Sequence, residues 1–394
     1  MSRRLISLND DLRALEEDGY EIAVQGGHLI VSNVPYVNAR AEVMRGHLVS
    51  VLELCGNDLT ASPIRQHIAM FAGEHPCDHS GAKLRHIEHT SSRQNLGGGL
   101  IVDHSFSAKP KEGYRDYHHK MTTYIEMISS HARLLDPTAT AQTYAVPSSS
   151  EVPTVFRYMD TASARAGIGA ITEKLRMEKV AIVGLGGTGS YVLDLIAKTP
   201  VEEIHLFDGD EFFQHNAFRG PGAASFSEIS SPKKKVEYWA ARYEPLRTGL
   251  VQHAVFLDEG NAGLLDQMDF VFLCVDSGTS KRPVVERLEA MGKPFIDVGM
   301  GVQIAGDQLL GIVRVTTSLP DRRNHFRSHV GLGEADVDQA YSQNIQIAEL
   351  NALNAALAVI RWKKLCGFYF DPEDEMTCNY TIDGNVIDNI GRAL

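Results

Sequence analysis

The chain has 394 residues, of which 43% are hydrophobic and 22% charged, with 38 Lys and Arg against 50 Asp and Glu. This balance is typical of an ordered globular protein of about two domains and excludes wholesale disorder or a fibre. The net charge of −12 disfavours non-specific nucleic-acid binding, and no apolar run approaches the roughly 18–20 residues that span a bilayer.

The first residues carry charges where a signal peptide needs an apolar segment, so we expect a cytoplasmic protein. Residues 8–20 predict a short helix, residues 21–34 a hairpin around Gly26-Gly27, and residues 117–135 a second helix. This mixture predicts a smaller α+β domain over residues 1–140. Its role stays open between partner binding and a module resembling a conjugating enzyme.

Nine of the sixteen histidines fall between His67 and His131, and Cys77 stands in the sequence HPCDH. The spacing H-x-C-x-H matches no common tetrahedral zinc finger, so we predict no zinc site. Residues 104–124 are rich in aromatic and basic side chains, which fits either a binding surface for a carrier protein or conjugating enzyme, or an ordinary loop and helix.

A Pro/Ser/Thr/Ala-rich stretch predicts a linker over residues 141–155, followed by a second domain over residues 156–394. Short apolar runs here alternate with helical segments, which is typical of strands buried in a parallel sheet. We therefore expect an α/β domain with a Rossmann-like, doubly wound, mostly parallel sheet. These runs lie in residues 179–187, 203–210, 270–276 and 294–299.

The most specific local motif is a glycine loop between an apolar run and a helical segment. Such loops let backbone N–H groups approach phosphate oxygens at the start of a helix, so the motif predicts a nucleotide site. Asp208 follows the next apolar run, 24 residues after Gly184, near the separation at which an acid reaches a ribose hydroxyl. Up to this point an NAD dehydrogenase fits equally well. The loop glycines are Gly184, Gly186, Gly187 and Gly189.

Further charged and polar residues follow in order: Asn216, Arg219, Lys235 in a basic run, and Asp276 after the apolar run FVFLCV. A dehydrogenase does not need this set. Arg and Lys neutralise a triphosphate, and a carboxylate at the end of a strand holds Mg²⁺. The pattern therefore favours ATP over NAD.

In this set the sequence resembles the ThiF-type family of adenylating enzymes, which includes ubiquitin-activating enzymes, over roughly residues 157–365. The resemblance implies an activating-enzyme fold in which the glycine loop lies against ATP, and Asp208, paired in sequence with Asp210, binds the ribose. It implies that Arg219 and Lys235 contact the phosphates, that Asn216 orients them and that Asp276 holds Mg²⁺. Arg165 matches a family arginine that reaches the other protomer's ATP.

The implied reaction is adenylation of the C-terminal carboxylate of a ubiquitin-like or sulfur-carrier protein that ends in Gly, in a bacterial ubiquitin-like conjugation pathway. A carboxylate needs no general base at neutral pH, so Arg219, Lys235 and Asp276 would act by positioning and charge stabilisation. The resemblance also implies a homodimer and a conjugating enzyme as a further partner. Neither a nucleic acid nor a membrane is expected as a partner.

The chain departs from relatives that carry an acyl thioester, because residues 300–365 contain no cysteine. The enzyme then stops at the adenylate, forms an oxyester on a hydroxyl of residues 316–318, or passes the product to another thiol. We expect Cys274, Cys366 and Cys378 to be packing residues. The alternatives are an NAD-dependent Rossmann oxidoreductase, a catalytically idle dimeric scaffold, and adenylation of a small peptide or small molecule.

Overall fold

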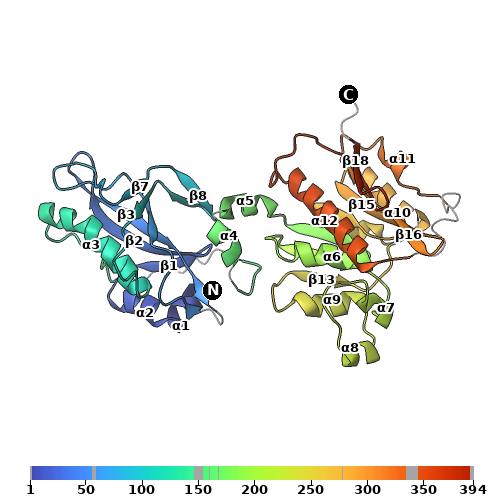
Figure 1. The fold of residues 1–394 in the computed structure, drawn as a ribbon, viewed down its shortest axis with the longest axis horizontal. Coiled ribbons are helices and arrows are strands. Elements are labelled where there is room, and N and C mark those ends of the chain that lie inside the picture. Colours follow the sequence, from blue (N-terminus) through green and yellow to red (C-terminus); the bar gives the residue numbers. More distant parts are fainter. Residues whose placement is uncertain are drawn as a thin grey trace. The chain divides into compact units, whose positions relative to one another are not determined.

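The protein is described here by a computed structural model, which covers residues 2–55, 59–145, 154–158, 160–166, 168–276, 278–333 and 345–390. The chain forms two compact units, Met1–Glu173 and Lys174–Leu394, which we describe one at a time (Figure 1). The predicted linker over 141–155 falls in the first unit, and its residues 146–153 lie outside the described residues. The predicted domain boundary therefore stays a prediction.

The first unit combines short helices with antiparallel strands. Its helices are α1 (Ser2–Leu8), α2 (Asp10–Glu17), α3 (Tyr117–Leu135), α4 (Thr161–Ala166) and α5 (Gly169–Thr172). Its strands are β1 (Ile22–Gln25), β2 (His28–Val37), β3 (Val43–Val51), β4 (Leu54–Cys55), β5 (Leu59–Thr60), β6 (Ile68–Ala72), β7 (Glu88–Thr90), β8 (Gln94–Gly97), β9 (Leu100–Val102) and β10 (His104–Ser107).

Six of these strands form one antiparallel sheet in the order β1-β2-β3-β6-β10-β7. The predicted hairpin is confirmed, since Gln25 pairs with His28 across Gly26-Gly27, both of which have positive φ. The predicted long helix is also confirmed as α3, and Asp116 caps it by accepting a hydrogen bond from the His119 N–H. Buried side chains of α3 and the sheet form the core of this α+β unit.

The second unit is an α/β unit. Its helices are α6 (Gly187–Ile196), α7 (Gln214–Ala217), α8 (Phe226–Ser230), α9 (Lys235–Tyr243), α10 (Gly278–Ala290), α11 (Phe326–His329) and α12 (Ala348–Leu365). Short 3₁₀ helices cover Glu173–Leu175, at the junction of the units, and Ala262–Leu265. Its strands are β11 (Lys179–Val183), β12 (Glu203–Phe207), β13 (Leu250–His253), β14 (Phe270–Leu273), β15 (Phe295–Ala305), β16 (Gln308–Ser318), β17 (Thr377–Thr381) and β18 (Val386–Ile390).

These strands form one sheet in the order β13-β12-β11-β14-β15-β16-β17-β18. The first five run parallel, as the apolar runs predicted. The last three are antiparallel to their neighbours. The change of direction has a local cause: β15 and β16 are joined by the tight turn Gly306-Asp307, and two strands joined so closely can pair only antiparallel.

Helices cover both faces of the parallel part of the sheet, which explains why its strands are continuously apolar. Alternate residues of β11 point to opposite faces. Val180 and Ile182 pack with α6, α9 and α12, whereas Ala181 and Val183 pack with α10 and α11. This confirms the predicted doubly wound α/β fold and leaves the ends of the strands as the accessible edge of the sheet.

Candidate functional site

The strand order of the second unit reverses between β11 and β14. From β11 the chain proceeds outward through β12 to β13, and then returns to the other side of β11 to form β14 and β15. In open α/β sheets, ligands bind outside the carboxyl ends of the strands at such a reversal. The glycine loop after β11, Asp208 after β12 and Asp276 after β14 all lie at this edge.

The glycine loop needs its glycines for different reasons. Gly184 has φ +88°, and a Cβ there would lie 2.7 Å from the carbonyl oxygen of Cys274. A Cβ at Gly189 would overlap the carbonyl oxygen of Gly184. Gly186 differs, because a Cβ there would meet nothing within 4 Å. The loop is thus packed on its inner side and open at Gly186, where the N–H groups at the start of α6 can approach an anion.

Asp208 holds the glycine loop and the following turn together. Its carboxylate accepts one hydrogen bond from the Leu185 N–H at 2.7 Å and another from the Asp210 N–H at 2.8 Å. The side chain is almost completely buried. The acid that the sequence assigned to a ribose therefore also orders the loop that would bind the phosphates.

Lys235 joins the same group from the start of α9. Its Nζ lies 2.6 Å from Asp210 Oδ2 and 3.6 Å from Asp208 Oδ2, and its side chain is only 8% exposed. Asp210 Oδ2 accepts a hydrogen bond from this ammonium group, and Asp208 adds a second negative charge beyond hydrogen-bond distance. The structure therefore brings the sequence pair Asp208 and Asp210 together with Lys235, which the sequence analysis selected from a later basic run.

Asn216 and Arg219 lie on and just after α7. Asn216 is 4% exposed, and its Oδ1 accepts a hydrogen bond from the Phe213 N–H at 2.9 Å. Within the described part of the chain, Asn216 Nδ2 and Arg219 Nε are buried donors without a hydrogen-bond partner. Burial, followed by the charges of Arg219 and Lys235, lowers the pKa of His215. Arg219 and Lys235 therefore both place positive charge near His215.

Asp276 lies three residues beyond β14 and is exposed. Its Oδ2 accepts a hydrogen bond from Gln346 Nε2 at 2.7 Å. Gln346 lies just before α12 and was not selected from the sequence. An exposed carboxylate at the carboxyl edge of a sheet is a suitable oxygen ligand for Mg²⁺, so the donor type fits the predicted metal. Arg165, the remaining candidate, falls in α4, but its side chain lies outside the described residues.

Sequence reasoning also missed Asn351, which reaches the site from α12. Its Oδ1 accepts a hydrogen bond from Thr188 Oγ1 at 2.9 Å, and its Nδ2 donates to the carbonyl oxygen of Arg219 at 3.3 Å. Asparagine is a weak helix former, so its presence inside a helical segment was the signal in the sequence that could have pointed to a side-chain contact here.

A buried ion cluster supports the edge of the sheet next to Asp276. Asp297 on β15 is fully buried, forms an ion pair with Lys281 Nζ of α10 at 2.6 Å, and accepts a hydrogen bond from Arg314 Nη2 of β16 at 3.0 Å. Arg314 also donates to the carbonyl oxygen of His329. No sequence spacing reveals this cluster, because the acid and its two basic partners lie on three different elements.

The cysteines of the second unit are poor nucleophiles. Burial, followed by the Asp297 carboxylate, raises the pKa of Cys274, and burial raises the pKa of Cys366 to about 12 and that of Cys378 in the same direction. A raised pKa keeps the thiol protonated and inert. The hydroxyls of residues 316–318 are buried within β16. Their burial disfavours the oxyester alternative at these positions.

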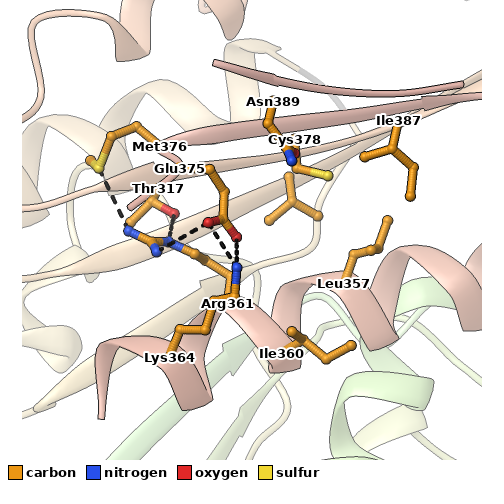
Figure 2. Close-up of a pocket in the computed structure, with 11 residues that line it drawn as sticks. Thr317, Leu357, Ile360, Arg361, Lys364, Glu375, Met376, Cys378, Ile387 and Asn389 are labelled. Atoms are coloured by element: carbon orange, nitrogen blue, oxygen red, sulfur yellow. Dashed lines mark hydrogen bonds and ion pairs between the residues drawn. The ribbon is translucent and has the colours of Figure 1, made fainter. Parts of the chain in front are cut away.

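A cavity of about 170 Å³ lies between α12 and strands β16–β18 (Figure 2), and its lining residues do not include the glycine loop. Its charges neutralise one another: Lys364 Nζ lies 2.7 Å from Glu375 Oε1, and Arg361 Nη1 lies 2.5 Å from Asp371 Oδ2. Arg361 Nε also donates to Thr317 Oγ1 at 3.3 Å. These pairs connect α12 to β16 and to the segment before β17, so we assign the charged side chains of the cavity a structural role.

The histidine-rich part of the first unit contains ring contacts. His75 and His104 have ring centroids 4.9 Å apart, and His75 Nε2 lies 3.4 Å from Glu88 Oε1. Among the described residues, no group of three or more His, Cys, Asp or Glu side chains is arranged to hold a metal ion. Over the same residues, no helix is long and apolar enough to cross a bilayer.

Comparison with known proteins divides the chain into two regions. Residues 160–356, half of the chain, match the model of the ThiF family. Residues 10–161 match a domain of unknown function, DUF6791.

Among individual proteins, ubiquitin-like modifier-activating enzyme 5 of Gallus gallus is 26% identical over 149 residues, and that of Branchiostoma floridae is 28% identical over 149 residues. The first match covers 34% of this chain and 37% of the relative, and the second 34% and 36%. The chain thus spans little more than a third of the length of these curated relatives.

Among solved structures, E. coli MccB with ATP aligns with a TM-score of 0.44 and 19% identity, over 67% of this chain and 77% of that chain. Selenomethionine PaaA aligns with a TM-score of 0.43 and 16% identity, over 56% and 75%.

Proposed function

Because this chain belongs to the ThiF family, we propose that it is an adenylyltransferase that uses ATP to activate the C-terminal carboxylate of a ubiquitin-like or sulfur-carrier protein. The observation that carries the proposal is the convergence at one sheet edge of an open glycine loop, buried donors on Asn216 and Arg219, and the ammonium of Lys235. Buried donors without partners are costly, and a triphosphate would supply acceptors for them.

In this proposal the triphosphate lies against the loop at Gly186, with its ribose near Asp208. A carboxylate oxygen of the partner attacks the α-phosphorus, the bond from that phosphorus to the bridging oxygen breaks, and pyrophosphate leaves. Arg219 and Lys235 stabilise the negative charge that moves onto the leaving group. Asp276, held by Gln346, would bind Mg²⁺, which supplies further charge neutralisation when present.

The proposed partners follow from the same chemistry. The attacking group is a C-terminal carboxylate, and a terminal Gly has no side chain to hinder its approach. A homodimer, a conjugating enzyme as acceptor, a bacterial conjugation pathway and a cytoplasmic location remain predictions. The raised pKa values of the thiols at 274, 366 and 378 support release of the adenylate, or transfer to a thiol on another domain or another chain.

The test is ATP–pyrophosphate exchange with the full chain, Mg²⁺ and a candidate ubiquitin-like protein that ends in Gly. We expect exchange that is lost when the candidate lacks its last residue and that falls at least about a hundredfold in Asp276→Ala, an effect of the size seen when a transition-state charge is left unstabilised. Asp307→Ala, an exposed acid in the turn between β15 and β16, is the matched control and keeps full activity.

Three results would contradict the proposal or a part of it. Absence of exchange with every Gly-terminated candidate, together with measurable NAD binding, would favour the oxidoreductase alternative. Unchanged exchange in Asp276→Ala would remove this residue from the site, and absence of both exchange and nucleotide binding in the wild type would favour the idle scaffold.

A further inference from the structure

Asn351 is a buried polar residue with an unusual position. It is the fourth residue of α12 and is 1% exposed, yet its side chain points across to the start of α6. The Asn351 backbone N–H already donates to the Ile347 carbonyl oxygen within the helix. The buried side-chain amide therefore needs hydrogen-bond partners on other segments. It finds them on two segments that are distant from it in the sequence.

The first partner is the glycine loop. Thr188 Oγ1 donates to Asn351 Oδ1 at 2.9 Å, across 163 residues of sequence. Asn351 and Gly187 are also in direct contact: the three atoms nearest to a Cβ at Gly187 would all belong to the Asn351 side chain. The amide therefore lies against the first turn of α6, where the phosphate-binding N–H groups start.

The second partner is the backbone of Arg219. Asn351 Nδ2 donates to the Arg219 carbonyl oxygen at 3.3 Å, across 132 residues. The segment around Arg219 has little support of its own, because α7 has four residues and Phe218 is 78% exposed. A neighbouring hydrogen bond comes from α6, where Tyr191 Oη donates to the carbonyl oxygen of Gly220 at 3.4 Å. One amide thus connects the loop to the segment that carries the arginine.

We propose that Asn351 is a positioning residue that sets the backbone of Arg219 relative to the glycine loop, so that the guanidinium and the loop N–H groups reach the same phosphates. The inference rests on the proposed function. An amide is required because it both donates and accepts in a fixed geometry. A carboxylate would accept from Thr188 but repel the Arg219 carbonyl, and an alanine would leave both partners unpaired.

The test measures ATP binding to the full chain by calorimetry in the presence of Mg²⁺. This measurement requires no carrier protein. Two lost hydrogen bonds predict that Asn351→Ala raises the Kd for ATP about fivefold to tenfold, and Asn351→Asp at least as much. Asn354→Ala is the matched control: this buried asparagine of the same helix donates to the Gly299 carbonyl oxygen instead. We expect it to lower the Tm while the Kd stays within about twofold.

A double-mutant cycle separates positioning from a general loss of stability. If Asn351 acts through Arg219, then Arg219→Ala raises the Kd about tenfold in the wild-type background but less than about threefold in the Asn351→Ala background. Additive effects, or an equal loss in Asn354→Ala, would overturn the inference while leaving the proposed function intact. A wild-type chain that does not bind ATP would overturn both.

Discussion

The carboxylate of Asp208 accepts a hydrogen bond from the backbone N–H of Leu185, at a distance of 2.7 Å. The acid at the end of β12 therefore orders the loop at the end of β11. In a parallel sheet these two ends are adjacent, so a residue with a predicted role in binding the ribose also shapes the part of the site that receives the phosphates.

This relationship predicts the effect of Asp208→Ala. Loss of the carboxylate leaves the N–H groups of Leu185 and Asp210 without an acceptor and removes one partner of Lys235. We expect ATP affinity to fall more than about tenfold, since hydrogen bonds to charged groups are worth roughly 1.5–3 kcal/mol. Calorimetry measures the affinity. Asp266→Asn, in the ion pair with Arg287 remote from the loop, is the control and binds ATP normally.

The loop glycines predict a contrast between two alanine variants. Gly189→Ala places a Cβ against the Gly184 carbonyl oxygen, so the loop must open, and we expect a loss of about 1–3 kcal/mol in the free energy of unfolding. Gly186→Ala meets nothing within 4 Å, so the fold tolerates it, but the methyl group occupies the open side of the loop and weakens ATP binding. Urea unfolding and calorimetry on both variants measure the two effects. Equal stability of the two variants would contradict this account of the loop.

The buried ion cluster predicts a large effect on stability. Lys281→Ala leaves Asp297 fully buried with Arg314 as its one charged partner among the described residues, and breaking such a pair typically costs about 3–5 kcal/mol. We expect a loss of about 3 kcal/mol in urea unfolding of the full chain. Lys198→Ala breaks an exposed pair with Asp194 and provides the comparison, for which we expect less than about 1 kcal/mol. Similar losses in both variants would show that burial of the cluster does not matter.

The buried histidine His28 in the first unit leads us to expect that the stability of the protein depends on pH. Burial lowers the pKa of His28 below its ordinary value of 6.5, so the folded state takes up this proton less readily than the unfolded chain. The stability from neutral His28 is present above pH 6.5 and is lost as the pH falls below that value toward the lower folded pKa.

Urea unfolding at pH 7.5 and 5.5 tests this prediction. We expect the wild type to lose more stability between the two pH values than His28→Gln, which has no proton to take up at this position. The control is His47→Gln, which replaces an exposed histidine and keeps the wild-type difference. If His28→Gln and the wild type lose the same amount, the burial of His28 does not contribute to acid sensitivity.

The sequence by itself determined the features that depend on residues adjacent in the chain. The strand, glycine loop and helix around Gly186, the hairpin at Gly26-Gly27, and helix α3 follow from backbone conformation and apolar periodicity, which act over a few residues. The order Asp208, Asn216, Arg219, Lys235 and Asp276 is also a property of the sequence, and it was sufficient to indicate the family.

Tertiary structure alone decided which other residues complete the site. Asn351 meets Thr188 across 163 residues because α12 packs on α6, and Lys281, Asp297 and Arg314 meet because α10, β15 and β16 adjoin. It also decided that the hydroxyls of residues 316–318 are covered. Such contacts depend on how whole elements pack, a long-range effect that no local spacing encodes.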